Sequence, residues 1–196
     1  MIKHCIGAGL AGMALLLAGC TTSTGTRVTR FHIPEPIARG QITVEPANPA
    51  DKGSLEFQTY ANVVGSELAR LGFTEAPGLS QSEQVATIAV ERATRESLRR
   101  SGLTIGVGGG SYGYRGGGVG GGVSVPVGGR TREDAATRLV VQLKRRSDGT
   151  VVWEGRAETS APAGSPAAQP AEAVRKLAAA LFRDFPGVSG GTITVK

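Results

Sequence analysis

Few residue types that perform catalysis occur in this chain. It contains two histidines and two cysteines among 196 residues. An activated nucleophile needs a neighbouring base, and a metal site needs several His, Cys or carboxylate ligands at close spacing. Neither pattern occurs around His32, and the adjacent acids Glu133 and Asp134 would point to opposite faces of a strand. We therefore predict no catalytic, metal-binding or cofactor-binding residues, and we expect that the protein is not an enzyme.

Cys20 is the residue whose surroundings indicate a specific modification. An apolar run from Ile6 to Leu17 follows Lys3. Its length lies within the range of about 7 to 15 residues of a signal peptide and below the roughly 20 residues of a spanning helix. The run ends in Leu17-Ala18-Gly19-Cys20, which resembles the lipobox of bacterial lipoproteins. We predict that residues 1–19 are a lipoprotein signal peptide and that Cys20 is the lipid attachment site. An ordinary secretory signal with a chance cysteine is the alternative.

The resemblance to lipoproteins implies where the chain is held. Such proteins carry several acyl chains, palmitate among them, and two or more chains hold a protein stably at a membrane. Thr21 stands in place of the aspartate that usually retains such proteins in the inner membrane. The resemblance therefore implies a protein that is lipid-anchored in the outer membrane and faces the periplasm.

Composition predicts one domain behind a short tether. Small polar residues fill positions 20–26, which we expect to be a lipidated flexible tether. Residues 27–196 have the size of a single domain. No cysteine follows Cys20, so we expect no disulfide. The formal net charge is +6, and Lys3 is the only charged residue in the removed segment, so the mature chain stays mildly basic.

Two segments have the periodicity of amphipathic helices. Apolar residues recur at steps of three and four from Phe57 to Leu71, with Ser54 as a candidate N-cap and Gly72 as a stop. A second apolar stripe extends from Val174 to Phe185 and should end at the following Pro-Gly pair.

Alternating apolar residues predict the strands. Val28–Ile33 and Gln41–Val44 have this pattern, and Thr192–Val195 is expected to add an edge strand. In Gln84–Arg100 the first half has the pattern of a strand, whereas the second half fits a strand or a helix.

A hairpin is the sharpest structural prediction. Two alternating runs flank Ser147-Asp148-Gly149. A three-residue loop with Gly149 in the left-handed conformation would set Leu143 opposite Trp153 and Val141 opposite Gly155, on one face. We expect Trp153 to lie in the core, between this hairpin and a helix.

These elements predict an α+β fold, in which an antiparallel sheet of about five strands has two helices packed on one face. The glycine-rich segment 102–129 is expected to be an insert between strands. Its nominal GxGxxG matches are not followed by a helix that could bind a pyrophosphate, so we reject nucleotide binding. We expect a wide loop, with an exposed edge that pairs with a partner strand as the alternative.

Two small basic clusters suggest weak binding to anionic surfaces. Lys144-Arg145-Arg146 lies at the tip of the predicted hairpin, and Arg99-Arg100 precedes the glycine-rich segment. Such clusters are usually solvated turns, but each charge near an anionic lipid or polymer is worth about 1 kcal/mol. Beyond the membrane itself, the expected partners are another envelope protein or a cell-wall polymer, and not nucleic acid.

Several short motifs resemble one bacterial lipoprotein family, domain of unknown function 4136. They include the lipobox at Cys20, the strand that contains Phe31, and the first helix with Tyr60 and Leu68. The glycine-rich middle, Val151-Val152-Trp153-Glu154-Gly155 and Phe185-Pro186 complete the pattern, and Ser82-Glu83-Gln84 departs from the family's frequent aspartate. The resemblance implies an α+β periplasmic domain behind a lipid anchor, with no established catalytic residues.

Together these patterns predict a lipid-anchored, non-catalytic envelope protein with a binding or structural role. The alternative is a hydrolase or transferase that acts on envelope material through residues that only the fold brings together.

Overall fold

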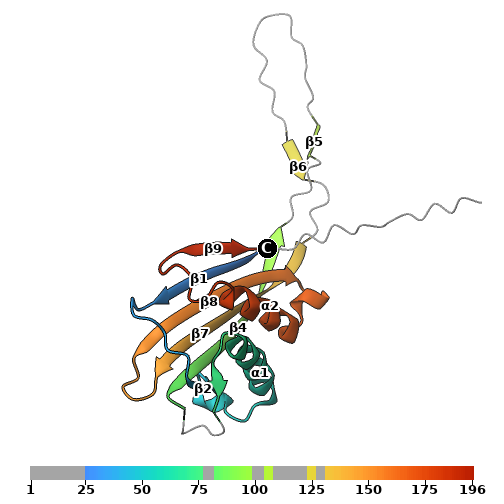
Figure 1. The fold of residues 1–196 in the computed structure, drawn as a ribbon. Helices are drawn as coiled ribbons and strands as arrows, with labels where there is room; N and C mark the ends of the chain where they lie inside the picture. The colour runs from blue at the N-terminus through green and yellow to red at the C-terminus, as the bar shows by residue number, and fades with distance from the viewer. Residues whose placement is uncertain (1–24, 77–81, 99–103, 108–122, 127–130) are drawn as a thin grey trace, which may run out of the picture.

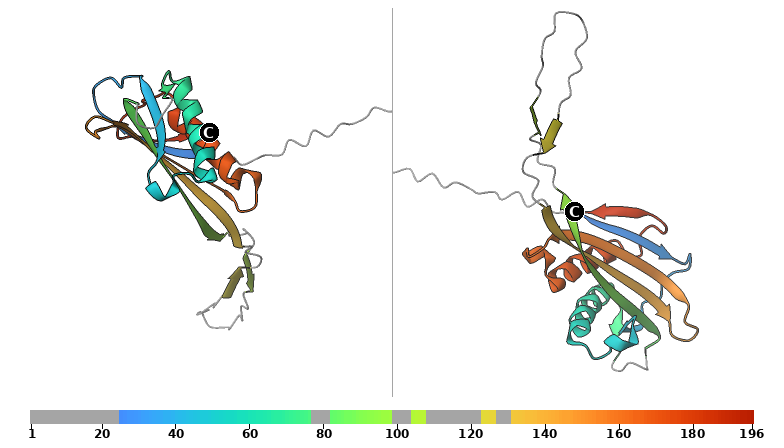
Figure 2. Two further views of the ribbon diagram at one scale, coloured as in Figure 1. Left: turned by 90° about the horizontal axis from the view of Figure 1, so that it is seen from below. Right: turned by 180° about the vertical axis from the view of Figure 1, so that it is seen from behind.

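A seven-stranded sheet with two helices on one face forms the body of the protein in the computed structural model (Figure 1). The structure describes residues 25–76, 82–98, 104–107, 123–126 and 131–196. Figure 2 shows both helices on the same side of the sheet, which leaves the other side of the sheet without a helical cover. The predicted α+β class is therefore correct.

The sheet contains strands from both ends of the chain, in the order β3-β2-β4-β7-β8-β1-β9. Its strands are β1 (Thr26–His32), β2 (Gln41–Pro46), β3 (Thr74–Glu75), β4 (Gln84–Leu98), β7 (Thr131–Arg145), β8 (Val151–Pro162) and β9 (Thr192–Val195). The helices are α1 (Leu55–Arg70) and α2 (Pro170–Phe182), and two 3₁₀ turns, η1 (Pro49–Asp51) and η2 (Pro166–Ala168), precede them.

The prediction of an antiparallel sheet of about five strands is wrong in two respects. The sheet has seven strands, and it is mixed, because β2 pairs in parallel with both β3 and β4. The physical reason is the helix between β2 and β4. A helix that packs across the sheet carries the chain back to the end where the first strand began, so the next strand runs in the same direction.

The segment that was ambiguous in sequence is a single strand. Gln84 to Leu98 form β4, which pairs with β7 along its whole length, from Gln84 opposite Arg145 to Leu98 opposite Thr131. Beyond this pair, β5 (Thr104–Val107) and β6 (Val123–Pro126) form a separate two-stranded sheet. The rest of the glycine-rich segment lies outside the described residues, so the expected loop and its edge-pairing alternative remain predictions.

The hairpin has the predicted register but a different turn. Leu143 lies opposite Trp153 and Val141 opposite Gly155, as the alternation predicts. Gly149 has a φ of +72°, the left-handed conformation. The chain is paired as far as Arg145 and Thr150, so the loop has one more residue than expected, and an irregularity beside Leu143 restores the register.

Both predicted helices occur, with one end corrected. The Ser54 side chain accepts a hydrogen bond from the Phe57 backbone N–H, which caps α1 as expected. Helix α2 ends at Phe182, earlier than the Pro-Gly stop, because the backbone leaves the helical conformation at Arg183, whose ψ is 133°, and Asp184 follows with a positive φ of 54°. Phe185 lies beyond the helix but still packs on the core.

Trp153 is the centre of the core, as expected, and is fully buried. Its indole stacks on Phe182 at 5.5 Å between ring centroids, and its Nε1 donates to the Pro186 carbonyl at 3.0 Å. A Cβ at Gly155 would overlap the Trp153 ring. Only glycine leaves room for the indole here, which explains the Trp-Glu-Gly sequence of β8.

Arg30 fastens β1 to the end of α2. Arg30 is buried, with an exposed fraction of only 4%. Its guanidinium donates to three backbone carbonyls, those of Leu181 at 2.9 Å, Ala180 at 3.0 Å and Arg183 at 2.8 Å. The last carbonyls of a helix lack partners within it and carry partial negative charge, so a cation stabilises them. Burial lowers the pKa of Arg30, and the nearby charge of Asp184 acts against this shift.

We predict that Arg30→Met destabilises the protein by about 2–4 kcal/mol, because three carbonyls, two of them in buried contacts, lose their donor. The matched control is Arg27→Met, on the same strand but on the other face, where the side chain is 66% exposed. This control should cost less than about 1 kcal/mol. Urea unfolding measures both, and equal losses would contradict the assigned role of Arg30.

Candidate functional site

The helix-free side of the sheet, here called the open face, carries most of the charged side chains of the central strands. Side chains on a strand alternate between faces. In β7, Leu139 and Val141 point toward the helices and are fully buried, whereas Arg138 is exposed. In β8, Ala157 is buried, and Arg156 and Glu158 lie on the open face. The open face is therefore polar, as is usual where an antiparallel sheet meets solvent.

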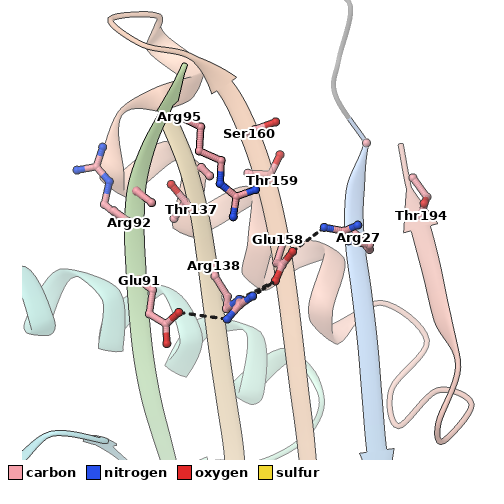
Figure 3. Close-up of a pocket in the computed structure, with 13 residues that line it drawn as sticks. Arg27, Glu91, Arg92, Arg95, Thr137, Arg138, Glu158, Thr159, Ser160 and Thr194 are labelled. Atoms are coloured by element: carbon pink, nitrogen blue, oxygen red, sulfur yellow. Dashed lines mark hydrogen bonds and ion pairs between the residues drawn. The ribbon is translucent and has the colours of Figure 1, made fainter. Parts of the chain in front are cut away.

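Four of these charges form a ladder across β4, β7, β8 and β1 (Figure 3). Arg138 lies between two acids and donates to Glu91 at 3.3 Å and to Glu158 at 2.6 Å. Glu158 also accepts from Arg27 at 2.8 Å. The pairing register places these residues side by side, since Glu91 is opposite Arg138 and Arg138 is opposite Glu158. Cross-strand pairs of opposite charge favour this register.

The ladder changes the proton affinity of its members. A hydrogen bond from Arg27, followed by the hydrogen bond and charge of Arg138, holds the pKa of the Glu158 carboxyl below its ordinary value of 4.5. The hydrogen bond to Glu158 raises the pKa of Arg138. Both side chains are therefore fixed in their charged forms at neutral pH, and Glu158 is unsuited to donate a proton.

Two hollows on the open face share the ladder residues. The first has a volume of about 540 Å³ and is lined by the ladder together with Arg95, Ser160 and Thr194. The second has a volume of about 680 Å³ and adds Phe31 and Arg156 to the ladder. The ladder residues line both hollows, so the two hollows adjoin each other, and together we call them the open-face groove.

The residues singled out in the sequence are not brought together. Cys20 lies outside the described residues, so its lipidation remains a prediction. His32 lies at the far end of β1, where Nδ1 is 2.8 Å from the Ile33 carbonyl and Nε2 is 3.1 Å from the Gly187 carbonyl. Glu133 lies near the opposite end of the sheet, on β7. Both ring nitrogens of His32 thus contact backbone oxygens rather than a nucleophilic side chain.

The basic hairpin tip is largely neutralised by acidic neighbours. Arg145 pairs with Asp148 at 2.7 Å. Arg146 folds back onto the sheet, where it pairs with Glu45 at 2.8 Å and donates to the Ser82 carbonyl at 3.0 Å. Two of the three cations of this cluster therefore have structural partners, and the other cluster, Arg99-Arg100, lies outside the described residues.

Two kinds of feature are absent from the described residues. In that part of the chain no group of three or more His, Cys, Asp or Glu side chains could hold a metal ion. Within the same residues, no helix combines the length and apolar character needed to cross a membrane.

The comparison with protein families agrees with the motifs noted in the sequence. The model of the family described as domain of unknown function (DUF4136) matches residues 24–187. The chain belongs to the DUF4136 family. The match includes the helices and all strands except β9. The Trp-Glu-Gly sequence that resembles this family now has a structural explanation, because Gly155 makes room for the Trp153 ring.

Other proteins are similar to this DUF4136 member. An uncharacterized protein of Zymomonas mobilis is 32% identical, over 86% of this chain and 79% of the relative. A PDZ domain protein from Parabacteroides distasonis has a TM-score of 0.47 at 11% identity, over 88% of this chain and 39% of that one. The PelC dodecamer from Paraburkholderia phytofirmans has a TM-score of 0.37 at 16% identity, over 78% of this chain and 93% of that one.

Sequence reasoning missed the ladder, although its members follow from the predicted hairpin. Once Leu139 is set opposite Ala157, Arg138 and Glu158 must be neighbours on the other face. Glu91 could not be placed, because its segment had no assigned pairing. The sequence does not indicate the buried position of Arg30, since an arginine in an alternating strand is normally expected to be exposed to solvent.

We predict that the contribution of Glu158 to stability depends on pH. Its pKa in the folded protein lies below 4.5, so its ion pairs add stability at neutral pH, and this contribution is lost as the pH falls through the folded-state pKa. Glu158→Gln should cost about 0.2–1 kcal/mol at pH 7, the range of exposed pairs. Urea unfolding at pH 7 and pH 3 measures both proteins, and a difference that persists at pH 3 would contradict the ladder.

Proposed function

We propose that this protein is a lipid-anchored, non-catalytic protein of the cell envelope, held by Cys20 in the outer membrane and facing the periplasm, with a single binding domain over residues 27–196. The observation that carries this proposal is the Leu17-Ala18-Gly19-Cys20 sequence at the end of the apolar run. Membership in DUF4136 brings no activity with it, since the Zymomonas relative is itself uncharacterized.

The position of β1 supports a tether that keeps the domain near the lipid. The strand begins at Thr26, and residues 20–25 can span at most about 20 Å. The start of β1 lies at the same end of the sheet as the last pair of β4 and β7, Leu98 with Thr131, whereas Gly149 at the hairpin tip lies at the other end. A domain anchored through Cys20 thus turns its hairpin tip away from the point of attachment.

The chemistry of the open-face groove favours binding over catalysis. Acid and base catalysis by two carboxylates requires that one of them hold a proton near neutral pH. In the groove, Arg138 lies between Glu91 and Glu158, and the pKa of Glu158 is lowered. This arrangement disfavours the alternative of an envelope hydrolase or transferase at this site.

We expect the mature protein to lack residues 1–19 and to carry acyl chains on Cys20. Intact mass and membrane fractionation measure this directly. Cys20→Ala should leave the chain unprocessed or release it from the membrane, because two or more acyl chains are needed for stable attachment. The matched control is Cys5→Ala, whose cysteine lies inside the removed segment. A wild-type mass without lipid would overturn the proposal.

A further inference from the structure

We infer that the open-face groove binds an anionic polysaccharide that carries carboxylates, such as a uronate polymer; this deepens the proposed envelope function and rests on it. The groove combines one arginine without a partner among the described residues, hydroxyl groups and one exposed aromatic ring. Each of these features has a counterpart in a chain of acidic sugars.

The charge of the groove is positive. The side chains that line it on the open face include two acids, Glu91 and Glu158, and the arginines Arg27, Arg95, Arg138 and Arg156. Glu154, which pairs with Arg156, lies on the same face of β8, so Arg95 is the cation in excess among these residues. Arg92, which also lines the groove, donates instead to the Ala168 carbonyl at 3.1 Å. An anionic ligand therefore meets a net positive surface, and guanidinium groups bind carboxylates in bidentate geometry.

Arg95 is the cation that the fold leaves available. In the part of the chain that the structure describes, no hydrogen bond or ion pair to its side chain occurs, although the three other arginines are paired. Figure 3 shows Arg95 extending from β4 over β7 toward β8, at the edge of the ladder. A carboxylate bound there gains a partner without breaking an existing ion pair.

Phe31 provides an apolar surface at the other end of the groove. Its side chain is 46% exposed on the open face, an unusual position for a phenylalanine, and it lines the hollow that contains Arg156. A flat ring of this kind can pack against the apolar C–H face of a sugar. Thr29 and Thr192, whose hydroxyls lie 2.7 Å apart, add groups that can bond to sugar hydroxyls.

The acids of the groove distinguish a polysaccharide from a lipid surface. Glu91 and Glu158 alternate with the arginines, so a dense layer of phosphates would face repulsion from them. A sugar chain offers hydroxyl donors to these carboxylates as well as its own carboxylates to the arginines. The groove also crosses five strands, about 19 Å at the usual strand spacing, which suits a linear polymer better than a single headgroup.

The test uses the purified, acylated full chain in neutral detergent, with oligogalacturonate as the acidic probe and dextran as the neutral one. Calorimetry at low and high salt should detect binding of oligogalacturonate that weakens with salt, and no binding of dextran. Arg95→Ala and Phe31→Ala should each weaken the affinity about tenfold. Arg175→Ala, an exposed arginine on α2, is the matched control and should leave the affinity unchanged.

Absence of oligogalacturonate binding, equal binding of dextran, or wild-type affinity in the Arg95→Ala and Phe31→Ala variants would overturn the inference. Binding to phosphatidylglycerol vesicles that Arg95→Ala abolishes, without binding to the polymer, would assign the groove to lipid instead. The intact mass of the same sample reports acylation separately. Failure of the polymer test therefore does not contradict the lipid anchor, and a mass without lipid does not contradict binding of the polymer.

Discussion

Arg30 donates hydrogen bonds from the middle of β1 to three carbonyls at the end of α2, and the order of the C-terminal part of the fold depends on this contact. It brings the helix end over the sheet, where Trp153 bonds to the Pro186 carbonyl. The chain then returns to the sheet through Gly190, whose N–H donates to the Arg30 carbonyl, and continues into β9. Arg30 thus holds the helix end through its guanidinium and the turn before β9 through its backbone carbonyl.

The same constraint decides which face of the sheet is free. Because α1 and α2 both pack on the side of Arg30 and Trp153, the alternate residues of β1, β7 and β8 have no helical cover. An uncovered sheet face must be polar to remain in solution. Here the polar residues form an ordered ladder, with the Arg138 guanidinium shared by two acids on neighbouring strands. The scaffold and the candidate site are therefore two faces of the same strands.

The sequence predicts those elements that local contacts determine, and it does not predict those that depend on contacts between distant segments. The helix stripes and the hairpin register follow from local periodicity, so Ser54 as a cap and Leu143 opposite Trp153 were correctly predicted. The parallel pairing of β2 with β4 depends on a helical crossover between distant segments, and β3 has only two residues. The role of Arg30 depends on carbonyls some 150 positions away in sequence, which no local pattern reports.

The candidate site was predictable only in its parts. Lipidation at Cys20 depends on a short local motif and could be proposed from sequence. The open-face groove required the pairing of four strands, so that Arg95 and Phe31, far apart in the chain, line connected hollows. The hairpin tip shows what a local pattern leaves out, because Glu45 and Asp148 pair with two of its basic residues.

The central claim is that the open face, and not the helical face, meets a partner in the envelope. Accessibility of single cysteines tests it most directly, because after Cys20 the chain has no other cysteine. Ala136→Cys places a thiol in the groove, and Ala179→Cys places one on the exposed side of α2. With N-ethylmaleimide, labelling at position 136 should be slower in intact cells than in purified protein, while position 179 reacts at the same rate in both. The account would be contradicted if the ratio of the labelling rate in cells to the rate in purified protein were the same at positions 136 and 179.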